Sequence, residues 1–142
     1  MPAPFRFDTV LRVREAERDR CRAMLVQEQM RRATITAERD RVASKRASVL
    51  EELQQLQSRN EWSAENALVL RQFAEHLATE HIRIEVELSD IAIAVSRCLR
   101  ELTAANTAVR GLEKLAGRHL ADQIRLEQKS AERDREESWR AA

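Results

Sequence analysis

One stretch of the chain limits the possible folds more than any other: from Leu70 to Leu126, apolar residues recur at alternating steps of four and three. The positions reached by these steps are Leu70, Ala74, Leu77, His81, Ile84, Leu88, Ile91, Val95, Cys98, Leu102, Ala105, Val109, Leu112, Ala116, His119, Gln123 and Leu126. All but two histidines and one glutamine are apolar, and the stretch contains no proline. A repeat of 3.5 residues places these side chains on one seam of an α-helix that winds around a partner helix. The pattern lasts about eight heptads, more than the three or four that already indicate a coiled coil.

The composition agrees with a helical chain that has little globular core. Its 142 residues include two glycines, two prolines, three phenylalanines, two tryptophans and no tyrosine, while 35% of the residues are charged. Such a composition is typical of long helices and coiled coils. The sequence therefore predicts an all-α fold with a single coiled-coil domain over residues 1–142.

A second helix is expected before the heptad stretch. Asp8 is a suitable N-cap residue, and no helix breaker follows it until about residue 57. We therefore expect a helix over about 9–57, a turn over about 58–63 and a helix over about 64–137. Two long helices with a short connection form an antiparallel two-helix coiled-coil hairpin. Its last stretch, from Glu127 to Ala142, is nearly all charged or polar and should fray.

The expected turn fixes the register of the hairpin. With its centre near residues 59–60, the numbers of paired positions sum to about 119, which places Cys21 opposite Cys98 within about one helical turn. Asn60 and Ser63 are both suitable caps for the second helix. Trp62 lies on neither seam, and it either covers the open end of the hairpin or anchors a partner.

Charge and cysteine content favour a protein-binding role in a reducing cytoplasm. Residues 1–60 carry 13 basic and 9 acidic groups, a balance of +4, which is too weak on its own to indicate nucleic-acid binding. Two distant cysteines form neither a disulfide framework nor a zinc pattern. No signal peptide or membrane-spanning run is visible. We expect a cytoplasmic protein that binds no nucleic acid.

Candidate catalytic and metal-binding residues are few. His76 and His81 are five residues apart and point about 140° apart around a helix, so they cannot share a metal ion. His81 and His119 lie on the seam, where buried spacers are commoner than ligands. No phosphate-binding loop or nucleophile motif is present. We expect no enzyme activity, no cofactor and no metal site.

Several apolar residues lie off the seam of the second helix. Phe73 flanks the seam, and Ile82, Val86 and Ile93 fall on the outer face. A solvated outer face is normally polar, so this stripe indicates burial against something else. Self-association, a third structural element and a specific partner are all consistent with it.

Three short motifs resemble those of one known family. They are the opening Phe5-Arg6-Phe7-Asp8-Thr9-Val10-Leu11-Arg12-Val13-Arg14-Glu15, the run Gln72-Phe73-Ala74-Glu75-His76-Leu77 after Trp62, and the late Leu112-Glu113-Lys114-Leu115. Together with the length and the hairpin layout, they are similar to the FliJ family, the small coiled-coil component of the bacterial flagellar type III export apparatus. That family is related to the stalk proteins of virulence secretion systems.

The resemblance implies a stalk-like coiled coil that works at the inner face of the cell membrane without spanning it. Its partners would be the hexameric export ATPase FliI, the cytoplasmic domain of the export gate FlhA, and export chaperones. Carried over by position, the gate-binding residues would be Phe73, Leu77, Ile84, Leu50 and Leu53. The residues facing the ATPase would be Phe5, Phe7, Arg12 and Arg14.

Two other functions remain open at this point. One is a secreted helical hairpin of the WXG type, although Trp62-Ser63-Ala64 lacks the glycine of that motif. The other is a purely structural coiled coil that self-associates through the Leu70–Leu126 seam. Measured mass and cross-linking of Cys21 to Cys98 within one chain would separate the hairpin from the dimer.

Overall fold

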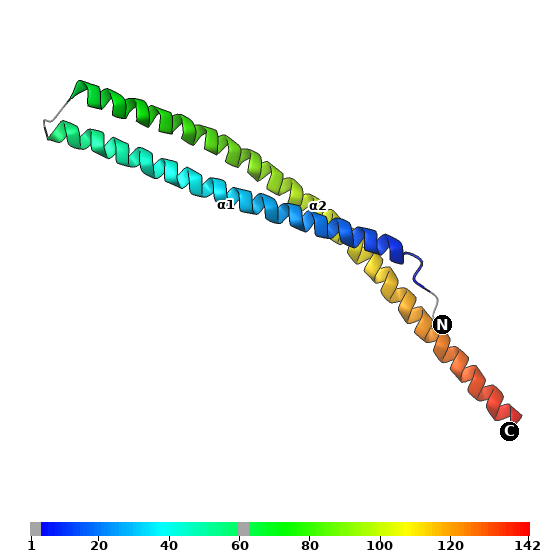
Figure 1. Ribbon diagram of the computed structural model, residues 1–142. Helices are drawn as coiled ribbons and strands as arrows, with labels where there is room; N and C mark the ends of the chain where they lie inside the picture. The colour runs from blue at the N-terminus through cyan, green and yellow to red at the C-terminus, as the bar shows by residue number, and fades with distance from the viewer. Residues whose placement is uncertain (1–3, 60–62) are drawn as a thin grey trace. The chain divides into compact units, whose positions relative to one another are not determined.

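The computed structural model describes residues 4–59 and 63–142, and these form an all-α helical hairpin. Helix α1 spans Asp8–Ser58 and helix α2 spans Ala64–Ala141 (Figure 1). No strand occurs in either described range. The fold class predicted from the sequence is therefore confirmed. The capping predictions for Asn60 and the role of Trp62 concern residues outside the described ranges.

Local contacts mark where the two helices begin. The amide of Asp8 donates to the carbonyl of Phe5 at 3.1 Å, and the Asp8 carboxylate forms an ion pair with Arg12 at 3.3 Å. At the start of α2, the Ser63 hydroxyl accepts from the amide of Asn66 at 3.5 Å. The Ser63 hydroxyl thus satisfies an orphan amide in the first turn of α2, while the negative charge of Asp8 favours the start of α1 through the helix dipole.

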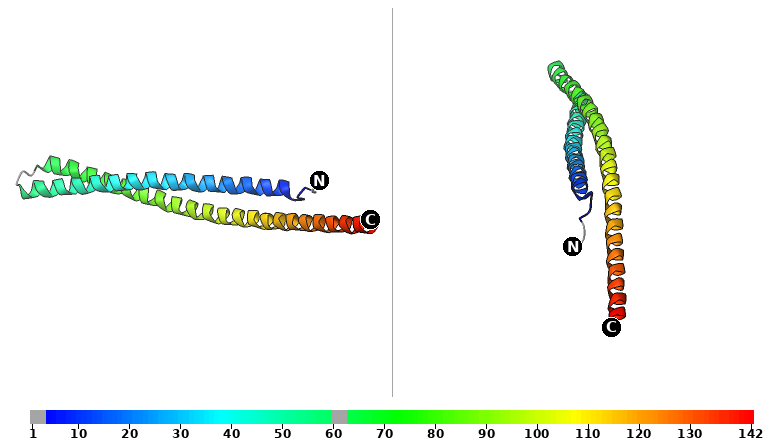
Figure 2. Two further views of the ribbon diagram at one scale, coloured as in Figure 1. Left: turned by 90° about the horizontal axis from the view of Figure 1, so that it is seen from below. Right: turned by 90° about the vertical axis from the view of Figure 1, so that its right-hand side faces the viewer.

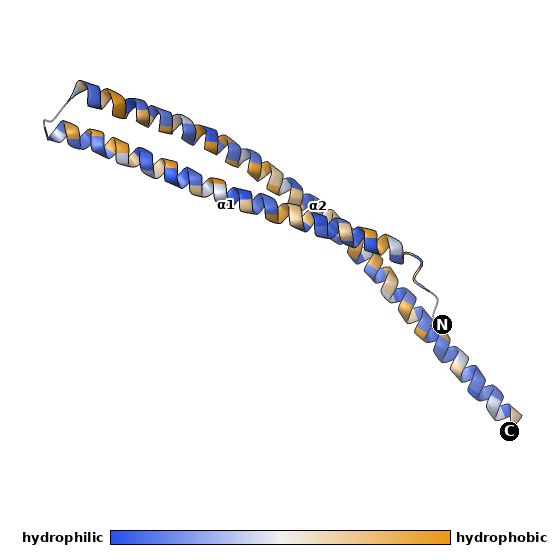
Figure 3. Ribbon diagram, viewed as in Figure 1, coloured by the Kyte–Doolittle hydropathy of each residue, from blue (hydrophilic) through white to orange (hydrophobic). Residues whose placement is uncertain are grey.

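Helix α2 extends beyond the expected end at about residue 137. It continues to Ala141 through a stretch in which polar residues dominate (Figure 3). No proline or glycine follows Gly117, and the alanine, glutamate and arginine residues of this stretch favour helix. This end of α2 has no apolar stripe with which to pack, but its residues still favour the helical conformation.

The chain divides into two compact units, each containing part of both helices. Met24–Cys98 forms the hairpin unit, and Met1–Ala23 together with Leu99–Ala142 forms the terminal unit. In the hairpin unit, α1 and α2 run antiparallel and side by side on either side of the turn (Figures 1 and 2). The two cysteines belong to different units, so their proximity stays a prediction.

The core of the hairpin unit lies on the predicted seam. Its cluster of buried side chains consists of Val42, Val49, Ala74, Leu77 and Ile84, with Ile35, Leu70 and Leu88 packed against it. Ile84 and Ile91 are fully buried. Helix α1 contributes two members to this cluster and α2 contributes three, because the seam of α1 alternates apolar residues with arginines.

Two ion pairs show the register of the hairpin unit. Arg31 lies 3.5 Å from Glu87, and Arg83 lies 3.8 Å from Glu38. The residue numbers of these pairs sum to 118 and 121, close to the predicted 119. The position of the turn in the sequence is therefore enough to set the alignment of the two helices in this unit.

Candidate protein-binding surfaces

The aromatic residues at the start of the chain form a small cluster in the terminal unit. The rings of Phe5 and Phe7 meet edge to face with centroids 5.9 Å apart. Phe5 also packs against the ring of His119 in α2, with centroids 5.7 Å apart. The Arg6 guanidinium lies 5.5 Å above the Phe7 ring. Phe5 thus holds the start of the chain against α2, while Phe7 remains 38% exposed.

The two arginines predicted to face an ATPase are also in the terminal unit. Arg12 pairs with Asp8 at 3.3 Å, and Arg14 pairs with Glu17 at 3.0 Å. Both arginine side chains are largely exposed, at 79% and 48%. Exposed ion pairs within one helix contribute little to stability. A partner with carboxylates could therefore take over either guanidinium at small cost.

The residues predicted to bind an export gate occupy two kinds of environment in the hairpin unit. Phe73 and Leu50 are exposed, at 43% and 46%. Leu77 and Ile84 are core residues, at 5% and 0%, and Leu53 is half-buried. Leu77 and Ile84 therefore offer almost no surface to a partner.

The exposed residues also lie on different flanks of the seam. Leu50 and Leu53 line a hollow together with Arg71, Ala74 and Ala78. Phe73 is five residues from Ala78, which places the two side chains about 140° apart around α2. We call the side with Leu50, Leu53 and Ala78 the open flank.

Phe73 belongs to the other side, which we call the bridged flank. It is one helical turn from Val69, which lines a separate hollow with Glu52, Leu56, Asn66 and Leu70. The same side carries the two ion pairs between the helices, Arg31–Glu87 and Arg83–Glu38. The resemblance groups Phe73, Leu50 and Leu53 on one patch, but the structure places them on two flanks.

The electrostatics of the bridged flank centre on Arg83. Its guanidinium donates to Glu80 at 2.8 Å and lies 3.8 Å from Glu38. The hydrogen bond from Arg83 holds the pKa of Glu80 below its usual value, and the same bond raises the pKa of Arg83. The hydrogen bond between Glu80 and Arg83 therefore favours the charged form of both side chains.

Three apolar residues on the outer face of α2 stay exposed. Ile82, Val86 and Ile93 each leave more than half of their surface to solvent. They lie at steps of four and seven, so they share one face of the helix. The off-seam stripe predicted from the sequence is thus present on the surface of the hairpin unit.

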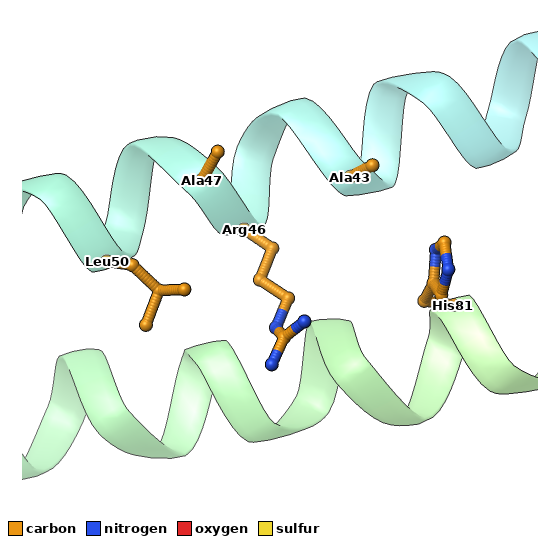
Figure 4. A pocket seen from close by; sticks show the side chains of 5 residues that line it. All are labelled: Ala43, Arg46, Ala47, Leu50 and His81. Atoms are coloured by element: carbon orange, nitrogen blue, oxygen red, sulfur yellow. The ribbon is translucent and has the colours of Figure 1, made fainter.

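Arg46 was assigned no role from the sequence. It occupies a seam column of α1, where its long side chain crosses the open flank toward α2 (Figure 4). The sequence of α1 shows that arginines and leucines share one column of positions seven residues apart. The flank that each arginine covers depends on the register and handedness of the pair, which a single helix pattern does not contain.

Residues 4–59 and 63–142 contain neither a cluster of metal ligands nor a membrane-spanning helix. No group of three or more histidine, cysteine, aspartate or glutamate side chains there could hold a metal ion. His81 is half-buried and pairs with Glu85 at 3.6 Å, an arrangement within one helix. Among the same residues, no helix has the length and hydropathy needed to cross a bilayer.

The comparisons with known proteins give one match. The model of the family described as flagellar FliJ protein matches residues 3–136. No curated protein and no solved structure matches the chain. The matched range includes all of α1 and α2 up to residue 136, with the opening aromatic cluster, Phe73 and the late Leu112–Leu115 motif. The chain therefore belongs to the FliJ family and is a coiled-coil protein related to flagellar export.

Proposed function

We propose that the chain is a non-enzymatic stalk and chaperone escort between the export ATPase and the export gate. The observation that carries this function is Phe73, a large aromatic residue left exposed at 43% inside the family-matched range. Partly exposed aromatic side chains beside a rigid core are typical anchors of protein interfaces. In this role the protein would act in the cytoplasm, peripherally at the inner face of the membrane.

Phe73 is the proposed anchor for the cytoplasmic domain of a FlhA-like gate. Leu77 and Ile84 belong to the core of the same helix and offer a partner little surface, while Leu50 and Leu53 contribute less because they line the other flank. The terminal unit would meet a FliI-like ATPase hexamer through Phe7, Arg12 and Arg14, with Phe5 fixing the aromatic cluster. The same surfaces would receive unloaded export chaperones.

The test is a quantitative pull-down with purified wild-type protein, the gate domain and the ATPase. Phe73→Ala should lose most of the gate binding and keep the ATPase binding. Leu68→Ala is the matched control, because Leu68 is also exposed near the turn but lies about 140° from Phe73 around α2. Unchanged gate binding by a folded Phe73→Ala protein would contradict the proposed gate contact.

The ATPase contact has its own test. Arg12→Ala combined with Arg14→Ala should weaken ATPase binding, and the wild-type interaction should weaken as salt is added because exposed charges are screened. Arg22→Ala serves as a control, since Arg22 is an exposed arginine of the same unit with its own ion pair to Asp19. Equal losses for the double variant and the control would remove the specific role of Arg12 and Arg14.

Self-association is a second candidate function, favoured by the exposed stripe of Ile82, Val86 and Ile93. Sedimentation of the purified chain over a hundredfold concentration range would reveal it. A mass that rises with concentration in the wild type but not in Ile82→Ser with Val86→Ser would assign the stripe to a homomeric contact. A constant monomer mass would exclude it.

A further inference from the structure

The open flank of the hairpin unit carries a groove between α1 and α2. Two adjacent hollows that share Arg46 and Leu50 form it. The apolar side chains that line these hollows are Ala43, Ala47, Leu50, Leu53, Ala74 and Ala78. Four of the six are alanines, so little side-chain volume separates the groove from the two backbones. Another helix could approach closely along it.

Arg46 gives this groove an unbalanced positive charge. Its side chain extends from α1 toward α2, and the ring of His81 rises from α2 on the same side (Figure 4). Within residues 4–59 and 63–142, no acidic group pairs with Arg46. Of the other charged residues lining the two hollows, Glu75 is acidic, His81 pairs with Glu85 within α2 and Arg71 also has a partner, so Arg46 is the side chain left to meet a ligand carboxylate.

The bridged flank shows how the same fold treats charge elsewhere. Its arginines, Arg31 and Arg83, each reach an acidic residue of the opposite helix. Arg46 instead lies in a seam column of α1, and the other α1 residues that line its hollow are Ala43, Ala47 and Leu50. A guanidinium that lies beside apolar side chains and has no acidic partner is suited to bind a carboxylate in a bidentate way.

We propose that the groove binds an amphipathic helix of a partner protein, with a carboxylate of that helix on Arg46. The apolar face of the partner helix would lie along the alanines and Leu50, and its acidic residue would meet Arg46 beside His81. Charge complementarity favours an acidic partner, and the elongated apolar floor favours a helix over a small anion. Docking here uses the flank opposite Phe73, so it does not depend on the gate contact.

The direct test uses a synthetic probe. A fluorescein-labelled helical peptide of alanine and leucine, with glutamate at seven-residue spacing, is titrated with the full chain and followed by anisotropy. A second peptide carries glutamine in place of glutamate. The glutamate peptide should bind at least about ten times more tightly, because a charge-assisted bidentate hydrogen bond is lost with glutamine.

Variants of the chain then place the contact. Arg46→Ala should lower the affinity for the glutamate peptide by about tenfold or more, whereas Arg41→Ala should not change it. Arg41 is a matched control because it is an exposed arginine of α1 and lines neither hollow. Ala47→Leu should also weaken binding, because it fills the groove without changing charge. Circular dichroism of each variant confirms that the helices are intact.

Two results would overturn the proposal. The first is equal affinity for the glutamate and glutamine peptides, or an Arg46→Ala protein that binds as well as the wild type. The second is a second copy of the chain as the occupant. In that case unlabelled wild-type chain would displace the peptide, and a concentration-dependent dimer would be lost in Arg46→Ala. The peptide assay does not involve Phe73, so the Phe73→Ala test of gate binding and the test of the groove can succeed or fail independently.

Discussion

The two flanks of the hairpin unit differ although they share one seam. The bridged flank carries the pairs Arg31–Glu87 and Arg83–Glu38 across the helix boundary. The open flank carries alanines, Leu50 and Arg46. Each exposed ion pair contributes little stability, but it fixes which positions face each other and covers the seam with polar groups. The open flank lacks this cover and leaves apolar surface next to a positive charge.

We infer that the seam stabilises the hairpin unit, whereas the two flanks bind partners. The seam, with Ile84 and Ile91 fully buried, holds both flanks in place, so damage to it should remove every surface at once. Changes on one flank should leave the helices intact and affect one contact. The predictions below test this division, beginning with the seam.

The largest effect is expected for Ile91→Asp. Ile91 is fully buried, and an aspartate there would place a carboxylate without a partner in the seam. We expect a loss of about 4 kcal/mol or more in the free energy of unfolding, measured by urea denaturation followed by circular dichroism. Ile93→Asp is the control two residues away, because Ile93 is more than half exposed and should tolerate the charge. Equal stability of the two variants would show that α2 is not buried along the predicted seam.

Leu77→Ala should have the next largest effect. Leu77 belongs to the core cluster, so its truncation should cost about 2 to 4 kcal/mol of unfolding free energy. Phe73→Ala, one turn earlier, should cost less than about 1 kcal/mol because much of the ring is already in water. Urea denaturation of the two variants side by side measures the difference. If both lost the same free energy, Phe73 would belong to the core rather than to a flank.

The seam and the helix positions follow from the sequence because they depend on local periodicity. Alternating steps of four and three identify Leu77, Ile84 and Ile91 as seam residues without knowledge of the partner helix. Asp8 and Ser63 mark helix starts through side-chain chemistry that is also local. The register follows from the turn, as the pair Arg83–Glu38 shows.

The candidate sites were less predictable because they depend on two helices at once. Leu77 and Ile84 were assigned to a binding patch by resemblance, although the same heptad pattern places them on the seam. The resemblance places Phe73 and Leu50 on one binding patch. Which flank of the hairpin each residue lies on depends on how the two helices pack, and this is not visible in the pattern of either helix alone. Arg31 and Arg46 are both arginines of α1, and the sequence of α1 alone does not show which of them has an acidic partner on α2. In the structure, Arg31 pairs with Glu87 and Arg46 pairs with no acidic residue of the described ranges.

A smaller effect is expected when binding on the two flanks is compared. Phe73→Ala should weaken binding of the gate domain by about tenfold, the typical effect of truncating an interface aromatic. Leu50→Ala should change the same affinity by no more than about twofold, since it lies on the open flank. Surface plasmon resonance with immobilised gate domain measures both. Equal losses would mean that one partner contacts both flanks, and the functional division between them would be wrong.

The smallest effect is expected for the ion pair within the bridged flank. The pKa of Glu80 is lowered by its hydrogen bond from Arg83, so the folded protein holds this carboxylate ionised at lower pH than the unfolded chain does. The stabilisation is therefore present above the usual glutamate pKa and is lost as the pH falls through the lower, folded value. Glu80→Gln should lower the Tm by only about one degree at pH 7, because the pair lies within one helix and is partly exposed. The effect should be smaller at pH 3, where the stabilisation from the ionised carboxylate fades. Differential scanning calorimetry at the two pH values checks this, with Glu75→Gln as the control on the same helix. An equal Tm difference at the two pH values would mean that the ion pair of Glu80 with Arg83 does not stabilise the bridged flank. The contrast with the open flank would then depend only on the pairs between the helices, Arg31–Glu87 and Arg83–Glu38.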